Sequence, residues 1–215
     1  MRNIPPLHLV TDDGVLARQS IMSVMQKVLE AGSTHLAVHI RGPASSGRKI
    51  HELVTRVRPI ADMTGGSLFL NDRVDIALTV RVDGLHLGQR STPVSVTRDL
   101  MGHSLTIGAS VHDESESIAA KEQGADYAFV GALFRTPSHR GISPHGPLFL
   151  SKLRSTVRGM PLIGIGGITP ERVGSVLGAG AKGVAVMRGI WDAQKPEDAV
   201  RAYLSQLMMG QGEQS

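Results

Sequence analysis

Gly166 and Gly167 follow a short apolar run and stand just before Pro170. Paired glycines let backbone N–H groups approach an anion, and a proline can begin the helix that follows. A later apolar run ends at Met187 and Arg188, where the guanidinium can add a charge-assisted contact. The two segments together predict a phosphate-binding site, with the alternative that the glycines only form turns.

An amide and a carboxylate, those of Asn71 and Asp72, follow another apolar run. Carboxylate and amide oxygens suit Mg²⁺ or a polar substrate. Alternatively, Asp72 caps the N-terminus of the next helix. One aspartate can serve in both ways, so Asp72 is a candidate metal or substrate ligand in either case.

His39 and Arg41 alternate with apolar residues, which places both on one face of a strand. Ser110 and His112 end a further apolar run, and residues 134–141 form a polar loop of the kind that closes over substrates. The chain has nine histidines, so most are expected to be structural and hydrogen-bonded. Their spacing does not indicate a metal site.

Short apolar runs alternate with helical stretches from end to end. The expected strands are 8–11, 35–40, 67–70, 84–87, 105–109, 127–131, 161–165 and 183–187. The expected helices are 20–31, 48–62, 72–80, 93–101, 114–123, 147–158, 170–179 and 197–209. Continuous apolar character is typical of parallel strands buried on both faces. Eight such units predict an α/β protein with a single (β/α)₈ TIM barrel.

An open doubly wound sheet is the alternative, but it usually has a Gly-rich loop after the first strand, and residues 11–14 are not one. In a barrel, the residues above meet at the C-terminal ends of the strands, and the phosphate site follows strands seven and eight. The barrel domain is expected to span residues 1–209, with 210–215 as a frayed tail.

Composition excludes several classes of protein. The chain has no Cys, which removes disulfides and thiolate chemistry and fits a cytoplasmic location. A net charge of +4 without a Lys/Arg run favours small anions over nucleic acid. No apolar run approaches ~18 residues, so no membrane span is expected. Aromatic residues make up only 3%, which predicts an aliphatic core. Common nucleotide-binding and hydrolase motifs are absent.

Taken in order, several segments resemble the thiamine phosphate synthase/TenI family, whose members are (β/α)₈ barrels. The segments that carry the resemblance are 9–12, 71–75, 84–89, 124–127, 134–136, 165–168 and 180–186. They cover nearly the whole chain. The resemblance implies thiamine biosynthesis with a small phosphorylated thiazole as ligand.

The family has two branches. The synthase joins a pyrimidine pyrophosphate to a thiazole phosphate with Mg²⁺, and the TenI branch shifts a proton in a thiazole carboxylate phosphate without a cofactor. Substrate-binding positions of the synthase are retained at Asn71, Asp72, Ser110 and Thr136, with Asp72 a metal ligand only in a synthase. The positions that depart from the synthase pattern are His39, Pro43, Arg90–Ser91, Ser138–His139 and Arg188.

Because one metal carboxylate and two lysines are replaced, the resemblance favours the thiazole tautomerase branch. The histidine of the characterised tautomerase corresponds to Ala132, so the acid–base role passes to His39 or His139, with His112 as a further candidate. Arg41 would hold the substrate carboxylate. A synthase with an altered pyrophosphate site and a non-catalytic thiazole-phosphate regulator remain the alternatives. A homo-oligomer is compatible with each.

Overall fold

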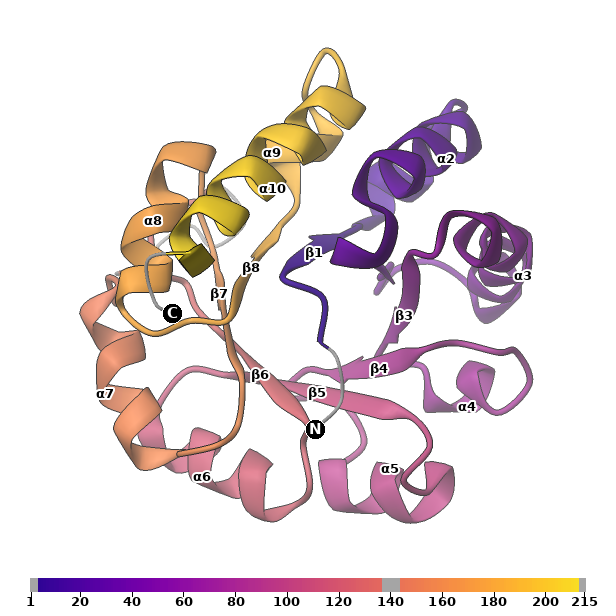
Figure 1. Cartoon of the computed structure of the whole chain (residues 1–215). Helices are drawn as coiled ribbons and strands as arrows, with labels where there is room; N and C mark the ends of the chain where they lie inside the picture. The colour runs from indigo at the N-terminus through magenta and orange to yellow at the C-terminus, as the bar shows by residue number, and fades with distance from the viewer. Residues whose placement is uncertain (1–3, 137–143, 213–215) are drawn as a thin grey trace.

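The computed structural model describes residues 4–136 and 144–212. Eight parallel strands pair in chain order and close into a barrel in which β1 also pairs with β8 (Figure 1). The strands are β1 (Leu7–Val10), β2 (Leu36–Ile40), β3 (Ser67–Asn71), β4 (Gly84–Leu87), β5 (Thr106–Val111), β6 (Tyr127–Val130), β7 (Leu162–Ile165) and β8 (Gly183–Val186). The structure confirms the predicted (β/α)₈ fold.

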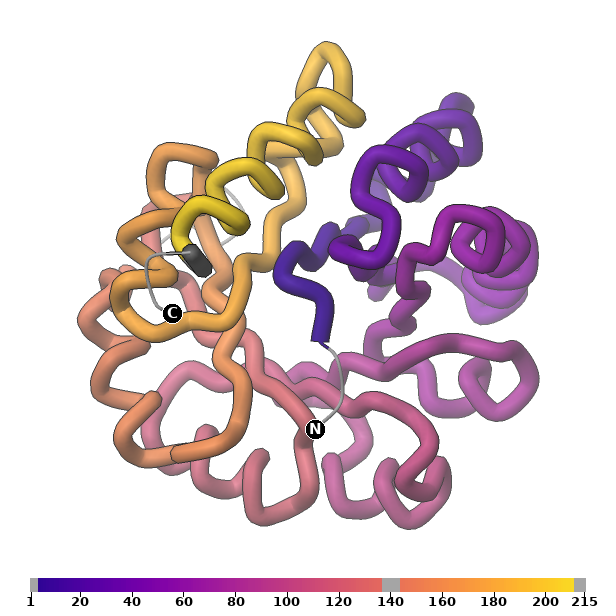
Figure 2. The backbone as a smooth tube through the Cα atoms, in the orientation of Figure 1, coloured from indigo at the N-terminus to yellow at the C-terminus, as the bar shows by residue number. Residues whose placement is uncertain are grey.

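Helices surround the barrel and follow the strands in turn (Figures 1 and 2). They are α1 (Asp13–Leu16), α2 (Ile21–Gly32), η1 (Ser33–His35), α3 (Gly47–Thr64), α4 (Val74–Ala77), α5 (Val94–Met101), α6 (Glu114–Glu122), α7 (Leu148–Thr156), α8 (Pro170–Gly178), α9 (Arg188–Trp191) and α10 (Pro196–Gly212). Leu, Ile and Val side chains fill the shell between strands and helices. This part of the core is aliphatic, as the composition predicts.

The inside of the barrel contradicts that prediction. Phe69, Tyr127 and Phe129 pack there with His8 and other buried histidines. Glycines on the neighbouring strands make the space. A Cβ on Gly84 would lie 2.2 Å from a ring carbon of Phe69, and one on Gly108 would lie 2.1 Å from the ring of Tyr127. A few aromatic residues therefore suffice to fill the interior, because glycines stand beside them.

Two expected elements differ from the structure by more than two residues at one end. The helix predicted over 72–80 is the single turn α4, and Asp72 lies outside it because its φ of 63° is not helical. Asp72 is not the N-cap of α4, since Arg73 holds that position. At the other end, α10 continues to Gly212, beyond the expected end of the helix at residue 209. The rest of the expected tail, 213–215, lies outside the described residues.

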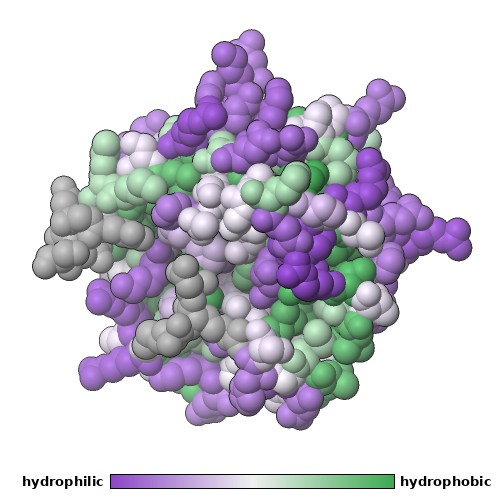
Figure 3. Space-filling view, turned by 45° about the vertical axis from the view of Figure 1, so that its right-hand side comes forward, coloured by the Kyte–Doolittle hydropathy of each residue, from purple (hydrophilic) through white to green (hydrophobic). Residues whose placement is uncertain are grey.

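One face of the surface is drawn by hydropathy in Figure 3. Hydrophilic residues cover most of the face drawn in Figure 3, and hydrophobic residues lie between them in patches. Across the two described ranges, no helix combines the length and apolar character needed to cross a membrane.

The buried histidines make acid destabilising. His8, His39 and His86 are almost fully buried, and burial lowers the pKa of each, that of His39 to about 4. The unfolded chain takes up these protons near pH 6.5, so stability is complete above that pH and falls as the pH drops toward the folded-state pKa. At pH 5 we expect a loss of about 2 kcal/mol from His39 alone. Urea unfolding at pH 7 and pH 5 measures this loss, and equal stabilities would contradict it.

Candidate active site

A pocket of about 330 Å³ opens at the C-terminal ends of β7 and β8. The predicted phosphate ligands Gly166, Gly167, Met187 and Arg188 all line it, and so does Thr136. The structure therefore brings these five predicted residues together, four of them from two loops that are 20 residues apart in the chain. The arrangement is the one expected of a barrel phosphate site.

The turn after β7 requires glycine at both positions. Gly166 has a φ of 99° and Gly167 a φ of 65°, a region that residues with side chains rarely adopt. A Cβ on Gly167 would also lie 2.5 Å from the carbonyl oxygen of Arg135. The backbone at this turn can approach a ligand closely because no side chain covers it.

Neighbouring side chains fix the phosphate pocket. The Tyr203 hydroxyl donates to the carbonyl of Ile168 at 2.9 Å, and Arg172 donates to the carbonyl of Gly167 at 2.6 Å while its guanidinium covers the Phe134 ring. Arg172 lines the pocket, as does Arg135. Neither arginine was predicted as a phosphate ligand from the sequence. Arg135 lies in the polar loop that was expected to close over a substrate, and Arg172 stands in the first turn of α8.

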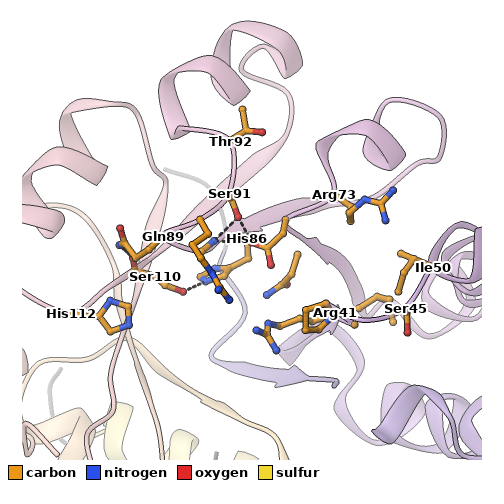
Figure 4. Close-up of a pocket in the computed structure, with 17 residues that line it drawn as sticks. Arg41, Ser45, Ile50, Arg73, His86, Gln89, Ser91, Thr92, Ser110 and His112 are labelled. Carbon is orange, nitrogen blue, oxygen red and sulfur yellow. Dashed lines mark hydrogen bonds between the residues drawn. The ribbon is translucent and has the colours of Figure 1, made fainter. Parts of the chain in front are cut away.

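A second pocket, of about 620 Å³, lies at the C-terminal ends of β2 to β5 (Figure 4). The predicted residues Arg41, Asn71, Asp72, Ser110 and His112 all line it. Its size suits a small-molecule ligand. The barrel places the two pockets at the same end of the molecule, since each follows the carboxyl ends of parallel strands.

Arg41 faces the interior of the second pocket from the end of β2 (Figure 4). The Thr11 hydroxyl fixes its backbone, accepting from the Arg41 N–H at 2.8 Å and donating to the Arg41 carbonyl at 2.9 Å. After burial and the nearby His39, the positive charge of Arg41 further lowers the pKa of His86. The guanidinium is therefore close enough for its charge to act on His86 at the C-terminal end of the barrel.

Polar groups on β4 and β5 form the opposite wall. Nε2 of His86 lies 2.9 Å from the Ser110 hydroxyl, and Nδ1 lies 3.2 Å from the hydroxyl of Tyr127. Gln89 donates to the Ser110 carbonyl at 2.6 Å. Because its pKa is lowered well below the usual value, His86 is neutral at pH 7 and orients Ser110 without adding charge.

Asp72 supplies the carboxylate of the second pocket. One of its oxygens accepts from the Gly88 N–H at 2.9 Å and from the Ser91 hydroxyl. The amide oxygen of Asn71 lies 3.0 Å from Nδ1 of His39. Two of the oxygens that a cation would use therefore already have partners.

This donor set does not fit a tightly held Mg²⁺. Magnesium is usually bound by one or two carboxylates together with substrate phosphates. Here one half-engaged carboxylate faces a lining that includes Arg41, Arg73 and Arg90. Within residues 4–136 and 144–212, no group of three His, Asp or Glu side chains is arranged to hold a metal. The expected role of Asp72 as a metal ligand gains no support from this geometry.

The three candidate acid–base histidines have different surroundings. His39 is fully buried inside the barrel, with Nε2 at 2.8 Å from His8 and Nδ1 at 3.0 Å from Asn71, and it lines neither pocket. The geometry therefore gives His39 a structural role. His112 lines the second pocket and is half-exposed, with Nδ1 3.1 Å from a Glu116 carboxylate oxygen. His139 lies outside the described residues.

Comparison with known proteins shows which family this chain resembles. A family model described as thiamine monophosphate synthase matches residues 7–190. A thiamine-phosphate synthase of Chlorobium luteolum is 36% identical over 94% of this chain and 92% of its own length. A thiamine-phosphate synthase of Clostridium acetobutylicum is 33% identical over 94% of each chain.

The structural comparison gives the same result. The thiamine phosphate pyrophosphorylase of Pyrococcus furiosus superposes with a TM-score of 0.84 at 29% identity, over 96% of each chain. These names favour the synthase, whereas the replaced carboxylate and lysines had favoured the tautomerase branch. The matches place the chain among enzymes of thiamine biosynthesis. It belongs to the thiamine monophosphate synthase family.

Proposed function

We propose that this protein is a thiamine phosphate synthase. Its substrates are a pyrimidine methyl pyrophosphate and a thiazole phosphate. The thiazole nitrogen forms a bond to the pyrimidine methylene carbon, and the bond from that carbon to pyrophosphate breaks with its electron pair. The observation that carries the proposal is the pair of arginine-lined pockets at one barrel mouth, since each substrate brings one anionic group.

Each pocket suits one substrate. The turn at Gly166 and Gly167, with Arg188 and Arg135, holds the thiazole phosphate through backbone N–H groups and guanidinium forks. Arg41 stabilises the negative charge that develops on the departing pyrophosphate. The larger pocket has room for the pyrimidine ring as well. The pyrimidine methylene carbon and the thiazole nitrogen then meet over the end of the barrel.

The test is incubation of the purified protein with both substrates, with and without Mg²⁺. We expect thiamine phosphate, identified by mass spectrometry, and one pyrophosphate released for each thiamine phosphate formed. If neither product appears under any condition while both substrates bind, the proposal is wrong. Omitting either substrate is the control, and it should abolish pyrophosphate release.

The His112–Glu116 pair favours a second candidate, the tautomerase. A histidine oriented by a carboxylate at the edge of a pocket can take up and return a proton. In this case the thiazole carboxylate phosphate alone, incubated in D₂O, should gain one deuterium and isomerise. His112→Asn should then reduce the rate by about 10²-fold or more. No deuterium uptake would exclude this candidate.

A further inference from the structure

The larger pocket differs from a magnesium–pyrophosphate site in its charge. Its lining contains Arg41, Arg73 and Arg90 but a single carboxylate, that of Asp72. Arg73 forms a two-pronged ion pair with Asp75, at 2.9 and 2.6 Å, so its charge is balanced. In the described part of the chain, neither Arg41 nor Arg90 forms an ion pair, although Arg41 interacts electrostatically with Asp13, a carboxylate outside the lining. The pocket therefore has an excess of positive charge before any ligand enters.

The carboxylate that remains is already engaged. The oxygen of Asp72 that accepts from Gly88 also accepts from the Ser91 hydroxyl. The Ser91 side chain, next to Arg90 in the chain, contacts the Asp72 carboxylate, so an acidic residue at position 91 would lie beside Asp72 and could share a cation with it. The Ser91 hydroxyl carries no negative charge to balance a cation, and it donates a hydrogen bond to the Asp72 carboxylate instead. This part of the pocket lining therefore adds a positive side chain, that of Arg90, whereas a metal site needs a further negative one.

We infer that this pocket binds the diphosphate group of its substrate directly, through Arg41 and Arg90, without Mg²⁺. The inference rests on the proposed function for the identity of that substrate. Guanidinium groups match phosphate oxygens with paired, charge-assisted hydrogen bonds, and two of them carry the charge of one divalent ion. The same two charges oppose the approach of a free divalent cation to Asp72.

Inorganic pyrophosphate is the probe, and isothermal titration calorimetry is the measurement. With excess EDTA, we expect the wild-type protein to bind pyrophosphate with an affinity within about threefold of that measured with Mg²⁺. Arg90→Met retains most of the side-chain stem and should weaken binding in EDTA by about tenfold or more. Arg56→Met is the matched control, because Arg56 is exposed on α3 away from the pocket, and its binding should match the wild type.

A second variant tests the same inference by restoring an acid. Ser91→Asp places a carboxylate beside Asp72 and should make pyrophosphate binding depend on Mg²⁺, with a loss of about tenfold or more in EDTA. Thermal unfolding confirms that the variant is folded. If Ser91→Asp binds pyrophosphate as well in EDTA as the wild type does, the excess positive charge is not what makes binding independent of Mg²⁺.

Wild-type binding that requires Mg²⁺, or that Arg90→Met leaves unchanged, would overturn the inference. These outcomes are distinct from failure of the proposed function. Pyrophosphate bound in EDTA through Arg90, together with no thiamine phosphate from the two substrates, would reject the synthase and keep the metal-free site. Thiamine phosphate formed only with Mg²⁺ would keep the synthase and reject the metal-free site.

Discussion

Replacing Arg41 with glutamine should reduce the turnover number for thiamine phosphate formation by about 10²–10³-fold, the usual effect of removing one group that stabilises developing negative charge. Arg41 lines the larger pocket, and its backbone is fixed by both hydrogen bonds of the Thr11 hydroxyl. The backbone that carries the guanidinium is therefore held at the edge of the pocket before the carbon–oxygen bond to pyrophosphate breaks. Steady-state kinetics with both substrates measure the effect.

Two further variants separate charge from geometry at this position. Arg41→Lys keeps the charge but loses the planar fork, so its activity should fall between those of the wild type and Arg41→Gln. Arg56→Gln removes an exposed arginine from α3 and should leave the rate unchanged. If Arg41→Gln retained wild-type turnover, the place we give to the pyrophosphate would be wrong.

Gly167→Ala should weaken binding of the thiazole phosphate by about 10–100-fold, the cost of losing one or two hydrogen bonds to a charged group. The new Cβ would lie 2.5 Å from the backbone carbonyl of Arg135, and a φ of 65° strains alanine. The turn must therefore shift, and its N–H groups move away from the phosphate. Titration calorimetry with thiazole phosphate alone measures the change without requiring catalysis.

Gly174→Ala is the matched control for that substitution. Gly174 lies within α8, and a Cβ there meets no atom within 4 Å. Affinity for thiazole phosphate should not change, and the melting temperature should rise, because alanine is the better helix former by about 1 kcal/mol. Equal affinities in Gly167→Ala and Gly174→Ala would show that the turn does not hold the phosphate.

The strands and most helices could be predicted from sequence because their patterns are local. Each strand is a short apolar run, and the observed ends of β4 match the prediction while those of the others differ by one or two residues. The helix expected over 72–80 begins later than predicted, and at its start the Asp72 carboxylate accepts hydrogen bonds from Gly88 and Ser91, which lie on another loop. A contact between loops leaves no periodic trace in the sequence.

Pocket-lining residues could be predicted from the sequence when they stand at the ends of strands. The sequence did not show which residues lie deeper, in the closed interior of the barrel. Arg41 and Ser110 stand at strand ends and line the larger pocket. His39 stands only two residues before Arg41, yet it points into the closed interior and bonds to His8 and Asn71. Alternation in the sequence shows on which face of a strand a side chain lies, but not how far along the barrel axis it lies. A buried histidine and a pocket-lining residue therefore show the same pattern.

A crystal structure with thiazole phosphate and inorganic pyrophosphate bound together tests most directly whether two separate anion sites share one barrel mouth. We predict the monophosphate against Gly167 and Arg188, and the diphosphate against Arg41 and Arg90, in crystals grown with EDTA. Both anions in one pocket, or a diphosphate bound away from Arg41, would contradict the account.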